Sequence, residues 1–269
     1  MDPESLIEQL DPAIFVLDTQ TTIYDRISLL RLQRFVRRLD DAYCYLEVGS
    51  HLGGSLLPHL ADPRCARAIS IDPRPLMLPD VRGHSIPYEE NSTSRMTDGL
   101  RKHLPARSLE KLQTFDSDAG TVRRSDIQRD VQLALIDAEH TNVAAFSDFL
   151  SIFPFLAEDA VIAYHDSNLI IDAIYNAERF LAYSDIPFRS VFLPDYVAAI
   201  GLGGMGEALV ADVGEAALDR VRFVASARRE LQTTVAMEVL DRDELGFLRT
   251  MKRAGRARLH RQLAWVFGS

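Results

Sequence analysis

The sequence predicts an α/β fold in which a mostly parallel sheet of seven strands is covered by helices on both faces and ends in an antiparallel hairpin. From residue 43 onward, short apolar runs alternate with longer segments of helical periodicity. This alternation is typical of a parallel sheet covered on both faces. The last two apolar runs are separated only by Pro194 and Asp195, too few residues for a crossover helix, so a tight hairpin is expected there.

Seven apolar runs are the candidate strands, and they cover residues 43–48, 67–72, 112–115, 131–137, 160–165, 188–193 and 196–201. Three segments with helical character lie between them, near residues 93–104, 141–156 and 169–184. Because helices separate the first five runs, these strands should be parallel, whereas the last two should pair in the hairpin.

Two helices are expected before the first strand. Asp2-Pro3-Glu4 places a cap residue, a first-turn proline and an early acid in the order that begins a helix. Thr21 or Thr22 can cap a second helix, whose apolar side chains recur at helical spacing as Leu29, Leu32, Val36 and Leu39. Its basic residues fall mostly elsewhere and predict a basic outer face: Arg31, Arg34, Arg37 and Arg38.

We divide the chain into an N-terminal helical cap over residues 1–40, a core over residues 41–205 and a helical C-terminal extension over residues 206–269. The extension carries a basic set, Arg228, Arg229, Lys252, Arg253, Arg256, Arg258 and Arg261. It also carries an apolar set, Leu245, Leu248, Met251, Leu259, Leu263, Trp265 and Phe267. Charged terminal helices are typical of a solvated face or an oligomer contact, which makes the terminal helices the candidate surface for a homo-oligomer.

Composition narrows the class of partner. The 269 residues include 39 acidic and 30 basic side chains, giving a formal net charge of −9. Proteins that hold nucleic-acid phosphates need clustered Lys and Arg, so we expect a small-molecule partner and no nucleic acid. No apolar run approaches the length of a membrane span, and the acidic amino terminus lacks the features of a signal peptide, so we expect no membrane contact and a cytoplasmic location.

A glycine-rich turn follows the first predicted strand, in the sequence Glu47-Val-Gly49-Ser50-His51-Leu-Gly53-Gly-Ser55. Glycines allow a ligand to approach the backbone, and the helix that follows offers free N–H groups to a phosphate or a carboxylate. A dinucleotide fingerprint places its second glycine two residues after the first, but His51 stands there, so a dinucleotide fits poorly.

The second predicted strand ends in Asp72, about 25 residues after Glu47. A carboxylate at this spacing is suited to accept hydrogen bonds from ribose hydroxyls. Because ligands of open α/β sheets bind at the carboxyl ends of the strands, Asp72 and the glycine turn should face the same ligand.

A second polar cluster is expected where two later strands end. Asp137 and His140 follow one strand, and His165 and Asp166 follow the next. Parallel neighbours bring their carboxyl ends to one edge, so these side chains form a candidate catalytic site. Asp137 and Asp166 suit magnesium, whereas His165 favours a transition metal, and a site without metal stays open.

The pattern Glu47-x-Gly49-x-x-x-Gly53 resembles the first motif of class I S-adenosylmethionine-dependent methyltransferases, which have a Rossmann-like fold. Residues 135–140 and 162–166 resemble the matching strand ends of a group that includes macrolide-sugar O-methyltransferases and cephalosporin-biosynthesis methyltransferase-like proteins. With the first motif, the resemblance spans roughly residues 20 to 205. It implies a cofactor site built by Glu47, Gly49, Ser50, Gly53, Ser55, Asp72, Asp116, Ser117 and Asp137, with Asp116 and Ser117 beside the adenine.

The resemblance also implies roles at the second cluster. In the sugar-methylating relatives the acid at the first strand end helps to bind a divalent cation and the histidine three residues later is the base, which correspond to Asp137 and His140. The candidate cation ligands are Asp137, His165 and Asp166, with magnesium as the expected ion. Histidine titrates in a range suited to removing a hydroxyl proton.

These observations predict an S-adenosylmethionine-dependent O-methyltransferase acting on a hydroxyl of a small molecule, such as a sugar or a natural product. One alternative is an NAD(P)-dependent oxidoreductase on a related fold, which Asp72 favours and His51 and the terminal hairpin disfavour. The other alternative is a catalytically inactive methyltransferase-like protein that serves as a binding partner.

Overall fold

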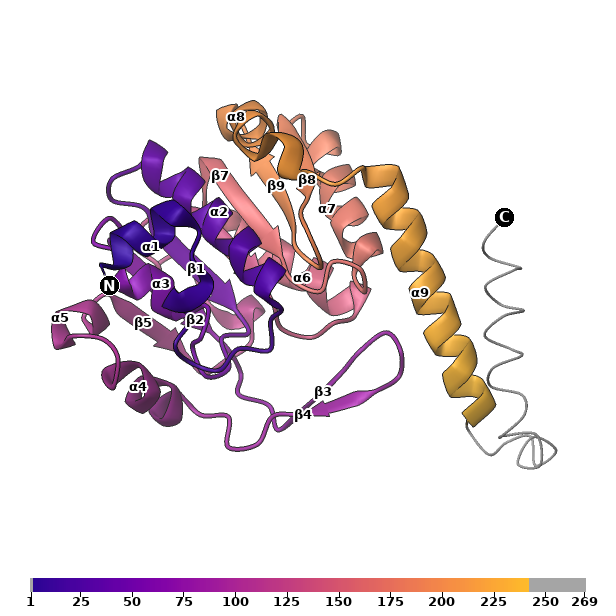
Figure 1. Ribbon diagram of the computed structural model, residues 1–269, viewed down its shortest axis with the longest axis horizontal. Coiled ribbons are helices and arrows are strands. Elements are labelled where there is room, and N and C mark those ends of the chain that lie inside the picture. The colour runs from indigo at the N-terminus through magenta and orange to yellow at the C-terminus, as the bar shows by residue number, and fades with distance from the viewer. Residues whose placement is uncertain (1, 242–269) are drawn as a thin grey trace.

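The computed structural model describes residues 2–241, and within them the main sheet has seven strands (Figure 1). Its order is β5-β2-β1-β6-β7-β9-β8. The strands are β1 (Cys44–Val48), β2 (Arg67–Ile71), β5 (Leu112–Phe115), β6 (Val131–Ile136), β7 (Leu156–Tyr164), β8 (Phe188–Phe192) and β9 (Ala198–Leu202). The first five pair in parallel, and β9 runs antiparallel to both β7 and β8. The predicted fold class is confirmed.

Helices cover both faces of this sheet. The α-helices are α1 (Pro3–Gln9), α2 (Ile23–Leu39), α3 (Leu56–Ala61), α4 (Thr93–Arg101), α5 (Ala106–Leu109), α6 (Asn142–Ile152), α7 (Ile171–Tyr183), α8 (Gly204–Val213) and α9 (Arg220–Asp241). Short 3₁₀ turns are η1 (Pro12–Ile14), η2 (Ala119–Thr121), η3 (Phe153–Phe155) and η4 (Gly214–Ala216). Apolar residues of α6, α7 and α9 pack on one face, and those of α1, α2, α3, α4 and α8 pack on the other.

The strands supply both cores because successive side chains of a strand point to opposite faces. In β6, Ala134 and Ile136 join the core under α6 and α7, whereas Leu133 and Leu135 join the core under α2. Every residue of β1 is buried, as expected for a central strand of a doubly covered sheet.

The N-terminal helices begin at the caps that the sequence suggests. Asp2 caps α1 by accepting a hydrogen bond from the N–H of Ser5. Thr22, rather than Thr21, caps α2, and Asp25 completes a reciprocal capping box with it. The predicted basic outer face of α2 is wrong for one residue, because Arg37 is buried.

A small hairpin between β2 and α4 was not anticipated from the sequence. Its strands, β3 (Met77–Pro79) and β4 (Ser85–Pro87), form a separate two-stranded sheet near the carboxyl ends of the parallel strands (Figure 1). The N–H of Val81 donates to the carbonyl of His140 at 3.1 Å, which attaches the hairpin to the loop after β6. Three-residue strands bounded by prolines give no readable alternation, so the sequence pattern does not reveal them.

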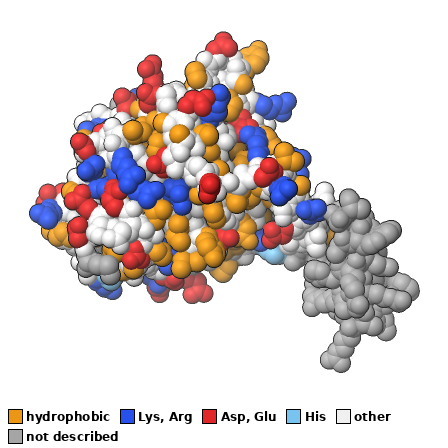
Figure 2. Space-filling model, turned by 45° about the horizontal axis from the view of Figure 1, so that its top comes forward, with side chains coloured by type: hydrophobic (Ala, Val, Ile, Leu, Met, Phe, Trp, Pro, Cys, Tyr) orange, Lys and Arg blue, Asp and Glu red, His pale blue; other side chains and the backbone are white. Residues whose placement is uncertain are grey.

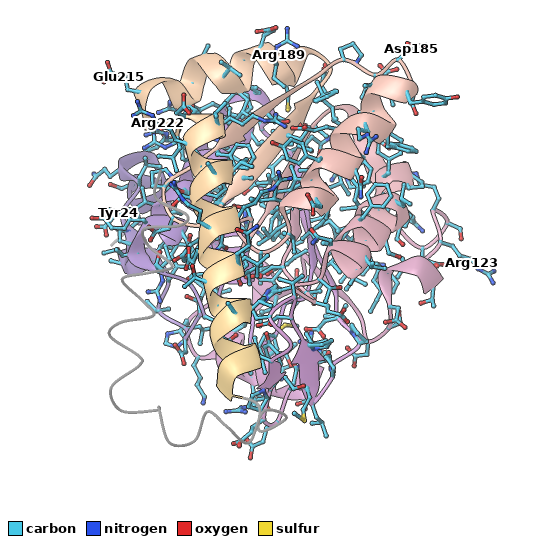
Figure 3. All side chains as sticks on the ribbon, turned by 90° about the vertical axis from the view of Figure 1, so that its right-hand side faces the viewer. Tyr24, Arg123, Asp185, Arg189, Glu215 and Arg222 are labelled. Atoms are coloured by element: carbon cyan, nitrogen blue, oxygen red, sulfur yellow. The ribbon has the colours of Figure 1, made fainter. Side chains whose placement is uncertain are left out.

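The helix α9 runs along one side of the molecule, as Figure 3 shows with Arg222 near its start. The apolar and basic residues expected beyond residue 241 in the C-terminal extension lie outside the described residues. On the face drawn in Figure 2, acidic, basic and apolar side chains are interspersed. Within residues 2–241, no helix has both the length and the apolar character needed to cross a membrane.

Candidate active site

Two adjoining cavities open at the carboxyl ends of the central strands. The first has a volume of about 130 Å³ and lies between the ends of β1, β2 and β6, the β3–β4 hairpin and α6. The second, about 60 Å³, is lined by the segment 18–21, the glycine turn and the polar residues after β6 and β7. Both cavities therefore lie at the edge of the sheet where the strand pattern predicts a ligand site.

Gly49 brings the ends of β1 and β6 together. Its φ is +91°, and an added Cβ would overlap the carbonyl oxygen of Asp137. The glycine at this position is thus required both by its backbone conformation and by the close approach of the neighbouring strand. Ser50, the next residue, is buried in the wall of the second cavity, and its Oγ has no hydrogen-bond partner among the described residues.

Glu47 lies beneath the glycine turn and lines neither cavity. It is fully buried, Tyr45 donates to its Oε2 at 3.2 Å, and the hydroxyl of Ser55 donates to its Oε1. Burial, together with the nearby charges of Asp137 and Asp72, raises the pKa of Glu47 to about 8. Through this hydrogen bond Glu47 positions Ser55, which does line the second cavity. Gly53 has a φ of +80° and packs against the Met96 side chain of α4.

Asp72 is held in place by the glycine turn and by Arg74. The backbone N–H of His51 donates to its Oδ2 at 2.8 Å, and the backbone N–H of Arg74 donates to its Oδ1 at 2.7 Å. The Arg74 guanidinium also donates to Oδ2, at 3.2 Å. The carboxylate is buried and lines the first cavity, where its remaining acceptor capacity can meet ribose hydroxyls.

The two residues predicted beside the adenine do not line the first cavity. Asp118 and Ala119 line the first cavity, whereas Asp116 and Ser117 do not. Asp116 instead accepts a hydrogen bond from the hydroxyl of Thr93 and lies 3.6 Å from Nε of Arg74. The turn η2 starts directly after Asp118, and this places the later pair at the cavity wall.

Asp137, His140 and Asp166 come together in the second cavity. Nε2 of His140 lies 3.6 Å from Oδ1 of Asp137 and 3.3 Å from Oδ2 of Asp166. One donor atom from each of these three residues lies within 4.8 Å of the other two. The His140 Nε2 is buried, and these two carboxylates face it without forming a hydrogen bond of good geometry.

His165 also lines the second cavity, but it is not one of the three residues whose donor atoms converge. Its Nδ1 is 3.0 Å from Oδ1 of Asp137, and its Nε2 is 3.3 Å from Oδ2 of Asp25. Both ring nitrogens thus face carboxylates, and the ring is 3% exposed. The cluster capable of holding a cation contains His140 where the sequence suggested His165, because the side chain of His165 turns toward α2.

The charges of these residues depend on one another. Burial opposes ionisation of Asp137, but the imidazoles of His165 and His140 hold its pKa well below the usual range. Burial likewise opposes the charge of His165, yet Asp137 and Asp25 raise its pKa well above 6.5. For His140, the carboxylates of Asp137 and Asp166 outweigh burial and raise the pKa. The corner is therefore built from alternating acids and imidazoles.

Four residues of the site were missed by sequence reasoning. Asp25 contacts His165 and Arg74 contacts Asp72, and nothing in the sequence near either residue indicates these partners. Tyr88, which directly follows the β3–β4 hairpin, lines both cavities. Asp148 lines the first cavity from α6, where burial and the charges of Glu139 and Asp118 raise its pKa to about 7.

Comparisons with known proteins bear on the domain and the fold. A family model described as a methyltransferase domain matches residues 46–167. Among solved structures, the apo form of a TDP-rhamnose 3′-O-methyltransferase of calicheamicin biosynthesis has a TM-score of 0.51 and 15% identity, covering 74% of this chain and 85% of that protein. An O-methyltransferase of tomaymycin synthesis from Streptomyces achromogenes, in complex with S-adenosylmethionine, has a TM-score of 0.43 and 15% identity, covering 76% and 91%.

No curated protein sequence matches the chain. At the identities above, likeness to a solved structure is evidence for the fold alone. The sheet order, the hairpin insertion of β9 between β7 and β8, and the family match over residues 46–167 all confirm the resemblance inferred from the motifs. Residues 46–167 thus match the model of a methyltransferase domain, and the chain has the Rossmann-like fold of class I methyltransferases.

Proposed function

We propose that this protein is an S-adenosylmethionine-dependent methyltransferase that methylates a hydroxyl oxygen of a small molecule. The observation that carries the proposal is the cluster of Asp137, His140 and Asp166 in the second cavity. This cavity adjoins the first cavity, which is lined by Asp72 and part of the glycine turn. The first cavity suits the adenosine part of the cofactor, and the second suits the methionine part and the acceptor.

His140 is the proposed base. A hydroxyl is a weak nucleophile at neutral pH, so it must lose its proton as the methyl group arrives. The acceptor oxygen forms the new bond to the methyl carbon, the carbon–sulfur bond breaks, and its electron pair stays on the sulfur of S-adenosylhomocysteine. The proton moves to Nε2 of His140, whose positive charge Asp137 and Asp166 stabilise at 3.6 and 3.3 Å.

The donor set also fits a divalent cation. Two carboxylates and an imidazole converge, and the buried Nε2 of His140 has no hydrogen-bond partner within the described residues. Asp137 and Asp166 would hold the ion, which supplies positive charge that orients the acceptor hydroxyl and stabilises its developing negative charge. His165 and Asp25 keep Asp137 ionised and oriented for this role.

The lining of the second cavity suits a hydroxyl-rich acceptor. It contains hydroxyl side chains, acids and imidazoles, namely Thr19, Thr21, Ser50, Ser55, Tyr88, Asp18, Asp137, Asp166, His51, His140 and His165. Acids and hydroxyl groups can exchange hydrogen bonds with the hydroxyls of an acceptor. A sugar or a glycosylated natural product meets this requirement.

Cofactor binding is the first test. Calorimetric titration of the purified protein should show saturable binding of S-adenosylmethionine and none of NAD. Asp72→Ala and Asp118→Ala should weaken that binding, whereas Asp116→Ala, the matched control outside the cavity, should leave it within about two-fold of wild type. Binding of NAD alone would refute the methyltransferase proposal, and binding of neither would favour a protein without catalytic activity.

Methyl transfer is the second test. A panel of hydroxylated acceptors is screened by S-adenosylhomocysteine formation, with Mg²⁺ or Mn²⁺ supplied or removed by chelation. His140→Gln should lower the rate with an accepted substrate by about 10²- to 10⁴-fold, the usual contribution of a general base, while S-adenosylmethionine affinity stays near wild type. An unchanged rate would remove His140 from the mechanism, and chelator insensitivity would remove the cation.

A further inference from the structure

The two cavities share part of their walls. Among the described residues, four line both cavities: Gly49, His51, Tyr88 and Asp137. The proposed cofactor has to extend from one cavity into the other, because its adenosine and methionine parts are joined at a single sulfur atom. That sulfur therefore lies at the junction of the two cavities.

Tyr88 contributes the aromatic surface at this junction. It follows β4 directly, and its backbone N–H donates to the carbonyl of Leu76 at 2.8 Å, which fixes the residue to the base of the hairpin. Its side chain is 8% exposed. The ring packs against His51 with centroids 5.0 Å apart and an interplanar angle of 81°, so two elements hold it in place.

The phenol is neutral in this setting. Burial, followed by the charges of Asp137, Asp166 and Asp72, raises the pKa of Tyr88 to about 12. A neutral aromatic ring keeps its electron-rich faces and attracts a cation placed over them, more strongly where water is excluded. The sulfonium of S-adenosylmethionine carries such a charge, whereas the sulfur of S-adenosylhomocysteine is uncharged.

We propose that Tyr88 is the aromatic contact of the sulfonium and that its ring biases the site toward the methyl donor over the demethylated product. The inference rests on the proposed function, since it requires S-adenosylmethionine to be the cofactor. It assigns a residue of the β3–β4 hairpin to the charge of the reacting centre and so gives this hairpin a chemical role.

The experiment measures the dissociation constants of S-adenosylmethionine and S-adenosylhomocysteine by calorimetry and compares their ratio between variants. Tyr88→Leu should shift the ratio toward S-adenosylhomocysteine by about ten-fold relative to wild type, because the ring is lost while the charge of Asp137 stays. Tyr88→Phe keeps the ring and should stay within two-fold of the wild-type ratio. Leu78→Ala, on the same hairpin but lining only the first cavity, should weaken both ligands equally.

Tyr88→pentafluorophenylalanine guards against misfolding of the leucine variant, because it keeps the ring shape while depleting the electron density of its faces. Its ratio should shift in the same direction as that of Tyr88→Leu. An unchanged ratio in both variants would overturn the inference, as would an equal shift in Tyr88→Phe. Wild-type protein that binds neither ligand would refute the proposed function instead, so the two failures are distinguishable.

Discussion

His165 and Asp25 form a buried ion pair that joins the end of β7 to the first turn of α2, with Nε2 and Oδ2 3.3 Å apart. Asp25 is 1% exposed and also accepts a hydrogen bond from the backbone N–H of Tyr196 at 2.9 Å. One carboxylate thus connects the N-terminal helices, the β8–β9 turn and the candidate active site, although it precedes the matched methyltransferase domain.

Asp25→Ala should destabilise the protein by about 3 kcal/mol, because it removes one partner of a buried ion pair and leaves the imidazolium of His165 with less compensation. Urea unfolding followed by circular dichroism measures this loss. Thr22→Ala is the matched control, since it removes the helix cap and an exposed hydrogen bond to Asp195 but leaves the buried ion pair, and it should cost about 1 kcal/mol. Equal losses would indicate that Asp25 matters only as a capping residue.

The contribution of this pair should depend on pH in a defined window. The pKa of Asp25 is lowered from 3.8 despite burial, mainly by His165, so its stabilisation is present above pH 3.8 and is lost as the pH falls through the lowered value. The pKa of His165 is raised from 6.5, so its stabilisation is complete below pH 6.5 and is lost as the pH rises through the raised value.

The difference in unfolding free energy between wild type and Asp25→Ala should therefore be largest between about pH 4 and 6.5. It should shrink toward alkaline pH. Urea titrations at a series of pH values measure this dependence, and a difference that does not vary with pH would mean that the two side chains are not an ion pair.

Arg37 and Arg38 should differ sharply although both contact Glu8. The Arg37 side chain is 2% exposed and pairs with the fully buried Asp62 at 3.0 Å, whereas that of Arg38 is 48% exposed. Arg37→Ala leaves Asp62 uncompensated and should cost about 3–5 kcal/mol. Arg38→Ala should cost at most about 1 kcal/mol. Chemical denaturation of the two variants measures both losses, and similar values would show that burial does not govern these pairs.

Glu47 should make the protein less stable as the pH rises. Its pKa is raised from 4.5 to about 8, so the folded state binds more protons than the unfolded state between these values. Stability is then lost across this window by up to about 1.4 kcal/mol per pH unit. Glu47→Gln, measured by thermal unfolding without cofactor, should flatten the decline between pH 5 and 8. Parallel curves for the two proteins would contradict the shift.

Gly49→Ala should impair both folding and cofactor binding. The substitution meets the Asp137 carbonyl and occupies a φ of +91°, which together should cost more than about 2 kcal/mol. Gly99→Ala is the control, because this helical glycine lies in α4 and an added Cβ makes only ordinary contacts with Leu17. It should be neutral or stabilising by up to about 1 kcal/mol. Thermal unfolding and calorimetry with S-adenosylmethionine measure the two effects, and tolerance of Gly49→Ala would mean that the strand ends can separate.

The strands, and the edge of the sheet at which the cavities lie, could be predicted from the sequence because they depend on residues that are close together in the chain. The apolar run 131–137 is confirmed as β6. The short interval of Pro194 and Asp195 between two apolar runs correctly predicted the antiparallel β8–β9 pair. Parallel neighbours end at one edge, which explains why Asp137, His140 and Asp166 meet in the structure. The glycine-rich turn is also visible in the sequence, and Gly49 and Gly53 have the positive φ values that glycine readily adopts.

The roles of individual side chains depended on contacts between distant segments. Nothing in the local pattern distinguishes Arg37, which is buried and paired with Asp62, from Arg38, which is exposed. Likewise, His165 and His140 each follow a strand and line the second cavity, but α2 supplies Asp25 to the ring of His165. The periodicity of apolar residues indicates which side chains share one face of a helix or strand. Ion pairs and cavity walls form only when the chain is folded, because their residues come from different elements.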